Sequence, residues 1–537
     1  MAIFDLVFRN RDQEVPVVDE EAKGPHFTVF SSPKSSQPNS ESSSGFATPT
    51  EEKSLAPLGR CPEIGRLASW RGALILLVTS GSQFLDNVYM TSANVALSSI
   101  QKDFDVTSTN LQWMISAYTL TFGGFLLLAG VLSDQYGRKN ILCIGLFWLS
   151  VWTLAIGFGQ SFIQLTVFRG LQGIGAAMTV PSAIGIISAY FTGVDRTRGL
   201  AIYASSGTLG FCVGLIFGGF LTSSLGWRYI YYFIVIITGS LGILGAVVLP
   251  KDIMAKEKPK MDFVGASMST VGLILLQFVL SSGGSYGWSQ PFIIVLLILA
   301  VALLVAFTML QKYIAYPLMP LSLWKIPNFA GLYQNVIYYI VLTAQEVDKL
   351  SAGQTALRFL PMGAIGFVAS MGTGKLLEFV NGKYTLIAGL VLTVVAPIPS
   401  SITVSPESSF WINVFPTSLI SITAISLIFV TTSTCILTTV PINVKSLCGG
   451  MLNTAFQIGS GVALAISAAV TEAVDIEKGH DLAHQYSTGL WCSAGLAGLG
   501  LVVALFAVRR RGIGPEDRWI LLVRFDLSSV SFKCGKS

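Results

Sequence analysis

Two charged residues lie inside otherwise apolar stretches of this chain. Asp86 is the only acidic residue between Trp70 and Lys102, and Arg169 directly follows the uncharged residues 141–168. A charge at such depth in a membrane is costly unless it is paired or hydrated. Burial favours the protonated form of a carboxyl group, whereas a nearby guanidinium favours the ionised form. We therefore expect Asp86 and Arg169 to be partners in loading and releasing a proton, unless Arg169 only extends to the membrane interface.

Uncharged polar residues in the same stretches predict a cavity for a substrate. Gln334, Tyr338 and Gln345 would share one face of a helix, with Asn335 beside them. A wall of amides and aromatic rings suits a large, mostly apolar compound better than a sugar or an ion. The alternative is hydrogen bonding between helices, which is the commoner use of such residues. The predicted cavity residues are Gln83, Tyr118, Gln172, Gln334, Asn335, Tyr338 and Gln345.

A short segment with a distinctive order of glycine, acidic and basic residues follows the second apolar stretch. Its key residues are Gly130, Asp134, Gly137, Arg138 and Lys139. Residues 374–383 are a weaker copy, with Glu378 in the acidic position and one extra residue before the final Gly-Lys pair. The repeat indicates two related halves. Parallel halves around a central site are typical of secondary transporters.

Glycines recur at helical spacing in a later stretch and predict a close contact between two helices. Gly207, Gly210, Gly214 and Gly218 would share one helix face, and Gly219 follows directly. A row of small residues allows another backbone to approach closely within a membrane. We expect this glycine stripe to be a packing surface.

These residues must be held by membrane-spanning helices. The chain is 52% hydrophobic and only 12% charged, against about 25% charged residues in soluble domains. Apolar runs of about 20 residues are long enough to cross a bilayer, and they recur throughout the chain. The predicted spans are 72–95, 111–132, 140–159, 163–188, 199–223, 229–249, 263–281, 291–311, 328–346, 356–374, 384–400, 410–433, 448–470 and 487–508.

The placement of Lys and Arg predicts the orientation. With fourteen spans, the basic residues concentrate in the loops on the same side as the two termini, including Arg138, Arg196, Lys445 and the run 509–511. Cytoplasmic loops carry this excess, so we expect both termini in the cytoplasm. The expected organisation is a disordered tail over 1–68, a six-helix half over 69–250, a linker with a two-helix insert over 251–312, a second six-helix half over 313–508 and a tail over 509–537.

Residues 72–508 resemble the major facilitator superfamily, in particular its fourteen-span drug:H⁺ antiporter branch in a fungal-type form. The resemblance rests on the segment 130–139, on Arg169 with Gln172 and Gly173, and on the glycine stripe. It implies an all-α membrane protein with the major facilitator fold, in which fourteen helices form two six-helix halves and a two-helix central insert.

The resemblance also implies roles for individual residues. Asp134 would cap a helix start and meet basic groups of the other half, which makes the segment 130–139 a cytoplasmic gate. Arg169 would take part in proton coupling, and Asp86 matches an aspartate of the family's first span. The glycine stripe is associated with antiporters, although Leu215 stands where the family has proline after the central glycine. Ser98 likewise replaces a usual proline, and three extra residues precede Asn94.

We therefore expect proton-coupled efflux of small, mostly apolar compounds such as drugs, toxins or secondary metabolites. Two alternatives remain open. One is proton-coupled import of a nutrient or iron chelate, which the loss of proline at Leu215 favours. The other is a sensor that resembles a transporter but signals through its termini, which the long N-terminal tail allows. The direction of substrate flux under an inverted pH gradient distinguishes import from export. Deletion of the tail identifies a sensor if it removes a signalling response.

Other function classes lack support in the sequence. No nucleophile–base arrangement or phosphate-binding loop indicates an enzyme, and we expect no cofactor. His480 and His484 have the spacing of a helical metal pair, but without a third ligand we interpret them as polar surface. The basic residues are spread over short loops, which argues against nucleic-acid binding. We expect a monomer that binds a small-molecule substrate, protons and the lipid bilayer, in the plasma membrane or alternatively the vacuolar membrane.

Overall fold

The computed structural model describes residues 65–106, 111, 113–250, 262–313, 357–403, 409–440, 442–478 and 482–507, with isolated positions between 336 and 354. The predicted tails over 1–68 and 509–537 lie outside this range, apart from residues 65–68. Most of the predicted ninth span also lies outside it, and with it Gln334, Asn335, Tyr338 and Gln345.

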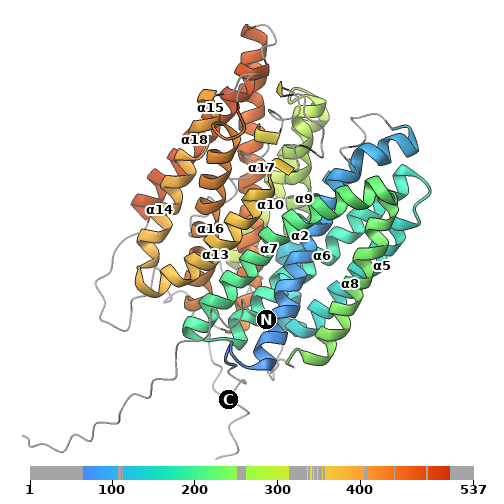
Figure 1. The fold of residues 1–537 in the computed structure, drawn as a ribbon, viewed down its shortest axis with the longest axis vertical. Coiled ribbons are helices and arrows are strands. Elements are labelled where there is room, and N and C mark those ends of the chain that lie inside the picture. Colours follow the sequence, from blue (N-terminus) through green and yellow to red (C-terminus); the bar gives the residue numbers. More distant parts are fainter. Residues whose placement is uncertain are drawn as a thin grey trace, which may run out of the picture. The chain divides into compact units, whose positions relative to one another are not determined.

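The described part of the chain is helical (Figure 1). Its helices are α2 (Trp70–Phe104), α4 (Trp113–Tyr136), α5 (Arg138–Gly157), α6 (Phe162–Tyr190), α7 (Gly193–Ser224), α8 (Trp227–Val248), α9 (Phe263–Tyr286), α10 (Pro291–Tyr313), α13 (Leu360–Phe379), α14 (Gly382–Val395), α15 (Ile398–Thr403), α16 (Val414–Thr439), the 3₁₀ turn η3 (Ile442–Val444), α17 (Lys445–Lys478) and α18 (Leu482–Ala507).

Among the described residues, 12 helical segments are long and apolar enough to cross a membrane. They coincide with predicted spans 2–8 and 10–14, and α2 coincides with the first. Helix α2 is less apolar than those segments because it carries Gln83, Asp86 and Asn87 in its interior. The prediction of an all-α membrane protein is thus confirmed, while the count of fourteen extends beyond the described residues.

Local sequence signals set the helix ends. Ser69 and Ser161 each accept a hydrogen bond from a backbone N–H three residues on, at the starts of α2 and α6, as N-cap residues do. Between α4 and α5 the chain turns at Gly137, whose φ of 99° is accessible to glycine but strained for other residues. A one-residue connection therefore brings α5 back alongside α4.

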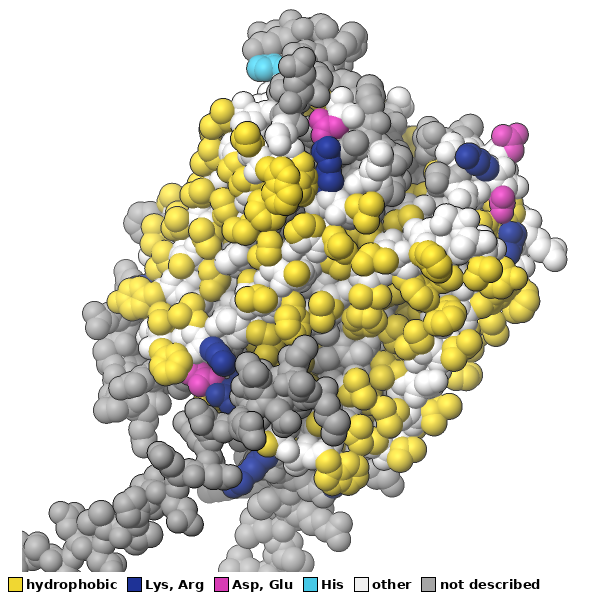
Figure 2. Space-filling model, viewed as in Figure 1, with side chains coloured by type: hydrophobic (Ala, Val, Ile, Leu, Met, Phe, Trp, Pro, Cys, Tyr) yellow, Lys and Arg dark blue, Asp and Glu magenta, His cyan; other side chains and the backbone are white. Residues whose placement is uncertain are grey.

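The outer surface has the polarity expected in a bilayer. Large apolar side chains such as Phe147 and Val247 are more than two-thirds exposed. Figure 2 shows hydrophobic side chains across the middle of the visible face, with charged ones near its two ends. Lipid tails are as apolar as the helices, so this surface carries no penalty in a membrane.

The helices pack in two groups that meet along two seams. Helix α2 packs on α7 and α8, α4 on α6, and α5 on α6 and α8, whereas α13 and α14 pack on α16. The first seam joins α4 to α17, and the second joins α7 to α13. Helix α9 contacts both α4 and α17. Helix α9 therefore lies along the first seam.

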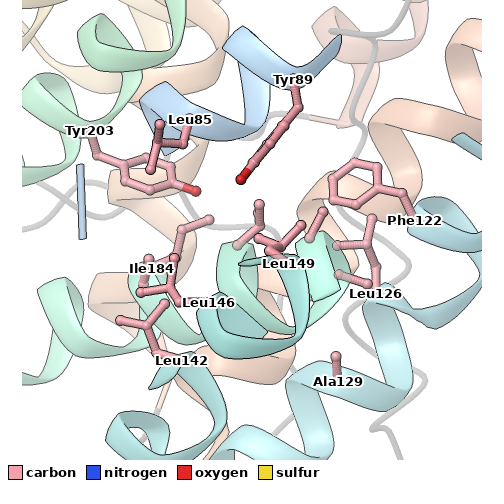
Figure 3. Packing of buried hydrophobic residues seen from close by; sticks show 14 of the residues in the cluster. Leu85, Tyr89, Phe122, Leu126, Ala129, Leu142, Leu146, Leu149, Ile184 and Tyr203 are labelled. Carbon is pink, nitrogen blue, oxygen red and sulfur yellow. The ribbon is translucent and has the colours of Figure 1, made fainter. Parts of the chain in front are cut away.

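An apolar cluster that lies mostly among the helices of the first group, and extends to α9, α10, α16 and α17, supports the candidate site (Figure 3). Leu85 and Tyr89 of α2 face Phe122 of α4, Leu149 of α5 and Tyr203 of α7 across this cluster. The glycine stripe lets α7 approach α2 closely enough for these contacts. A Cβ atom added at Gly214 would lie 3.0 Å from the Val88 Cα, and one at Gly218 would lie 2.8 Å from the Ser92 Cα.

Candidate functional site

Asp86 lies on α2 in the interior of the helix bundle. Its side chain is 9% exposed, and its Oδ1 accepts a hydrogen bond from the hydroxyl of Tyr118 on α4. A buried carboxylate is stable only if it is hydrogen-bonded or paired, or else it takes up a proton. Among the described residues, the aspartate predicted from the sequence has one side-chain donor, which comes from a neighbouring helix.

Arg169 lies on α6 and is 1% exposed. Its Nε donates to the Met114 carbonyl at 3.2 Å, and its Nη1 donates to the Gln172 Oε1 at 2.7 Å. Both terminal nitrogens also point to the Tyr89 carbonyl, at 3.5 and 3.4 Å. The guanidinium thus points into the bundle, where carbonyl and amide oxygens satisfy it. The alternative of a side chain extended to the membrane interface does not match this geometry.

Tyr118 connects the two charged residues. The Arg169 Cζ lies 4.9 Å from the centre of the Tyr118 ring, and the hydroxyl of the same ring donates to Asp86. The described residues show no direct ion pair between Asp86 and Arg169, and the Tyr118 ring lies between the two predicted partners. A cation over an aromatic face is stabilised by the ring quadrupole. The Tyr118 ring thus contacts both the carboxyl group and the guanidinium.

Gln172 supports Arg169, whereas the sequence suggested a cavity wall. Its oxygen accepts from Arg169 and its Nε2 donates to the Thr153 hydroxyl at 2.7 Å, and the side chain is fully buried. Its amide oxygen and its amide nitrogen thus each bind a protein group. Tyr118, also predicted as a cavity residue, contacts both Asp86 and Arg169.

Gln83 is held by a residue that the sequence reasoning missed. The Tyr203 hydroxyl donates to the Gln83 Oε1 at 2.5 Å. Tyr203 lies four residues before Gly207 on α7, so it extends the face of the glycine stripe by one helical turn. That spacing was a signal available in the sequence. The Gln83 amide nitrogen lies beside the glycine stripe, 3.2 Å from the position of a Cβ atom added at Gly207.

The predicted gate segment joins α4 to the start of α17. Asp134 accepts hydrogen bonds from the backbone N–H groups of Ser446 at 3.1 Å and Leu447 at 2.8 Å. A carboxylate at a helix N-terminus is favoured by the free N–H groups and by the helix dipole. Its ion pair is with Arg138 at 2.8 Å, a residue of its own half. The cap thus matches the expectation. Among the described residues the ion pair lies within one half, while Lys445 of α17, on the other side of the seam, interacts electrostatically with Asp134.

The remaining gate residues fix this arrangement. A Cβ atom added at Gly130 would lie 2.9 Å from the Leu447 Cα, so only glycine allows α17 to approach this closely. Arg138 also donates to the Ser446 hydroxyl at 3.1 Å and to the Ile442 carbonyl. Lys139 turns the other way and donates to the Leu249 carbonyl at 2.9 Å, at the end of α8.

The weaker copy of the gate segment lies at the second seam. Glu378 near the end of α13 forms two hydrogen bonds with Arg198 of α7, at 2.8 and 3.2 Å. The pair is partly exposed, with 38% of the Arg198 side chain accessible. The sequence repeat located Glu378 but gave no indication of its partner.

Comparisons with known proteins match these observations. The family model described as Major Facilitator Superfamily matches residues 79–464. The puromycin resistance protein pur8 of Streptomyces alboniger is 28% identical over 83% of this chain and 93% of its own length. The low affinity ammonium transporter of Saccharomyces cerevisiae is 26% identical over 84% and 92%. The multidrug transporter mfsC of Aspergillus fumigatus is 27% identical over 73% and 78%.

A solved structure shows the same fold. The human organic anion transporter MFSD10 superposes with a TM-score of 0.61 at 16% identity, over 80% of this chain and 99% of that chain. The family model covers well over half of the chain, and its match includes the gate segment, Asp86, Arg169 and the glycine stripe. The chain is therefore a multi-pass membrane transporter that belongs to the Major Facilitator Superfamily.

Proposed function

We propose that this protein exports small, mostly apolar compounds in exchange for protons by alternating access. The observation that carries the proposal is the buried arrangement of Asp86, Tyr118 and Arg169, in which one carboxyl group and one guanidinium face the same aromatic ring. Buried ionisable residues within spanning helices are typical of ion pathways and proton relays. Such a site binds and releases a proton, so it can drive the transport of an uncharged substrate.

The three residues suggest how a proton can be coupled to the conformation. When Asp86 is ionised, its negative charge is held by the Tyr118 hydroxyl and attracted by the nearby guanidinium. When Asp86 is protonated, this attraction disappears while Arg169 keeps its carbonyl partners on α2 and α4. The two protonation states therefore hold α2 and α4 together with different strength. A ligand or proton shifts a conformational equilibrium through such a difference.

Export is supported by relatives and by helix packing. Similar proteins are named a resistance protein, a multidrug transporter, the efflux pump terG of Aspergillus terreus and a cephamycin export protein of Amycolatopsis lactamdurans. The glycine stripe packs α7 on α2, as the antiporter-like pattern implies. We further propose a monomer in the plasma membrane with both termini cytoplasmic. The halves would span 69–250 and 313–508 around the insert at 251–312, with Gln83 lining the cavity between them.

The test measures uptake into inside-out vesicles under an imposed pH gradient, acid inside, with ethidium and puromycin as probes. Puromycin is chosen because of the name of the Streptomyces relative. The parent protein should accumulate at least one probe, and Asp86→Asn should lose more than nine-tenths of the gradient-dependent part, because the amide cannot take up a proton.

The matched control is Asp105→Asn, which makes the same chemical change on the same stretch of chain. Asp105 is exposed and ends α2 with a positive φ of 49°, which asparagine tolerates. This variant should transport like the parent. Unchanged gradient-dependent uptake in Asp86→Asn would remove the basis for proton coupling through this residue.

Import of a small cation is a second candidate because the ammonium transporter of Saccharomyces cerevisiae matches most of the chain. The same vesicles distinguish it. With radiolabelled methylammonium as the probe, an importer oriented inside-out should release the cation when the lumen is loaded. An exporter of apolar compounds should leave methylammonium flux at the level of vesicles without the protein.

A further inference from the structure

Lys445 is a buried basic residue whose role neither the gate segment nor the proton site explains. It is the first residue of α17, and it is 5% exposed. Its Nζ donates to the Ser188 carbonyl at 2.5 Å, in the last turn of α6. The carbonyls of a last helical turn lack partners within the helix and favour a positive charge. Lys445 therefore caps the C-terminus of a helix that belongs to the other group.

The charges around Lys445 make this bond its main anchor. Arg138, Arg196 and Asp134 all act electrostatically on its amine, and Asp134 is already occupied by Arg138 and by two backbone N–H groups. Among the residues that the structure describes, no carboxylate forms an ion pair with Lys445. A buried charge needs hydrogen bonds to offset its lost hydration. Its strongest available partner is the end of α6.

The first turn of α17 is thus held from two directions. Asp134 of α4 accepts from its N–H groups, and Lys445 of α17 donates to a carbonyl of α6. Each side chain binds free backbone groups at the end of a helix. Asp134 reaches from the first group to the start of α17, and Lys445 reaches from α17 back to the end of α6. Both must break if this end of α17 moves away from α4 and α6.

We propose that Lys445 is a positioning residue that locks the inner gate closed by capping α6. The proposal rests on the proposed alternating access, because only a gate that opens needs a lock. Lys445 belongs neither to the gate segment 130–139 nor to the glycine stripe. Removing the amine should shift the gate toward its open state without removing the Asp134 cap.

A native cysteine reports the state of this gate. Cys448 lies one turn after Lys445 on α17, is 2% exposed and belongs to the apolar cluster of the first helix group. It should react with a thiol reagent only when α17 separates from α4 and α6. The experiment is the rate of alkylation of Cys448 by N-ethylmaleimide in the full-length protein, measured by mass spectrometry of its peptide.

Lys445→Met keeps the length of the side chain but loses its donor, and Lys445→Arg keeps a cation with donors. We expect alkylation of Cys448 to be about tenfold faster in Lys445→Met, since a hydrogen bond to a charged group is worth at least that factor. Lys445→Arg should stay within about threefold of the parent. Cys212, which is buried at the second seam beside Phe359 and Leu360, is the internal control and should react at the parental rate.

Two results would overturn the proposal. One is an alkylation rate of Cys448 in Lys445→Met equal to the parental rate. The other is an equal acceleration at Cys212, which would indicate general loosening of the fold. The readout does not require transport. The two proposals can therefore fail separately. If the vesicle assay shows no proton-dependent flux but Cys448 is still alkylated faster in Lys445→Met than in Lys445→Arg, the proposed function fails and the role of Lys445 is supported.

Discussion

The two seams between the helix groups carry related sequence segments but use them differently. At the first seam, Asp134 is buried and caps the start of α17. At the second, Glu378 pairs with Arg198 at a partly exposed position. A buried, hydrogen-bonded charge is costly to break, whereas an exposed pair contributes about 0–1 kcal/mol. We infer that the first seam holds the gate and that the second mainly aligns α7 with α13.

The largest expected effect comes from Asp134→Ala. The change removes the cap of α17 and leaves the buried Arg138 without its carboxylate. Loss of one partner of a buried pair costs about 3–5 kcal/mol. We expect a lower midpoint of thermal unfolding in detergent, a loss of most transport and alkylation of Cys448 faster than in Lys445→Met. A midpoint equal to that of the parent would contradict the assignment of the stronger contact to the first seam.

A second, smaller effect is expected from Gly130→Ala. The added methyl group would lie 2.9 Å from the Leu447 Cα, which is backbone and cannot rotate away. Such overpacking typically costs about 1–3 kcal/mol, so α4 and α17 should separate slightly and Cys448 should react faster. The matched control is Gly372→Ala on α13, where the added carbon meets no described atom within 4 Å beyond the local helix backbone. Equal behaviour of the two variants would show that close approach at Gly130 has no part in the gate.

The smallest effect is expected from Glu378→Gln at the second seam. The amide removes the charge but keeps a hydrogen-bond acceptor for Arg198. Because the Arg198 side chain is 38% exposed, solvent screens the pair. Transport should stay within about twofold of the parent, with Cys448 alkylation unchanged. A loss as large as that of Asp134→Ala would show that the two seams contribute equally, and the comparison between them would fail.

Much of the fold follows from the sequence because a bilayer imposes simple rules. Runs of apolar residues located the helices, and Asp86 and Arg169 stood out because charges are rare in such runs. The close approach of α7 to α2 also follows from the spacing of the glycines, since the glycine stripe contacts α2 along one face. These features depend on local patterns and on the membrane as a solvent.

The partners of the charged residues could not be predicted in the same way. The sequence predicts Tyr118 as a cavity residue and Lys445 as a loop cation, but their contacts are hydrogen bonds to residues 32 positions and 257 positions away along the chain. Gln172 was assigned to the cavity because of its type, yet it binds Arg169 and Thr153. Which neighbour satisfies a buried polar group is decided by helix packing, which a residue pattern does not specify.

Movement of protons against substrate tests the central claim most directly. Proteoliposomes are loaded with a pH-sensitive dye, no pH gradient is imposed, and the probe that the vesicle assay identifies is added on one side. The account predicts that substrate flux moves protons in the opposite direction in the parent and in Asp105→Asn, and that Asp86→Asn moves none. Proton movement in Asp86→Asn at the parental rate, or substrate flux in the parent without any proton movement, would contradict it.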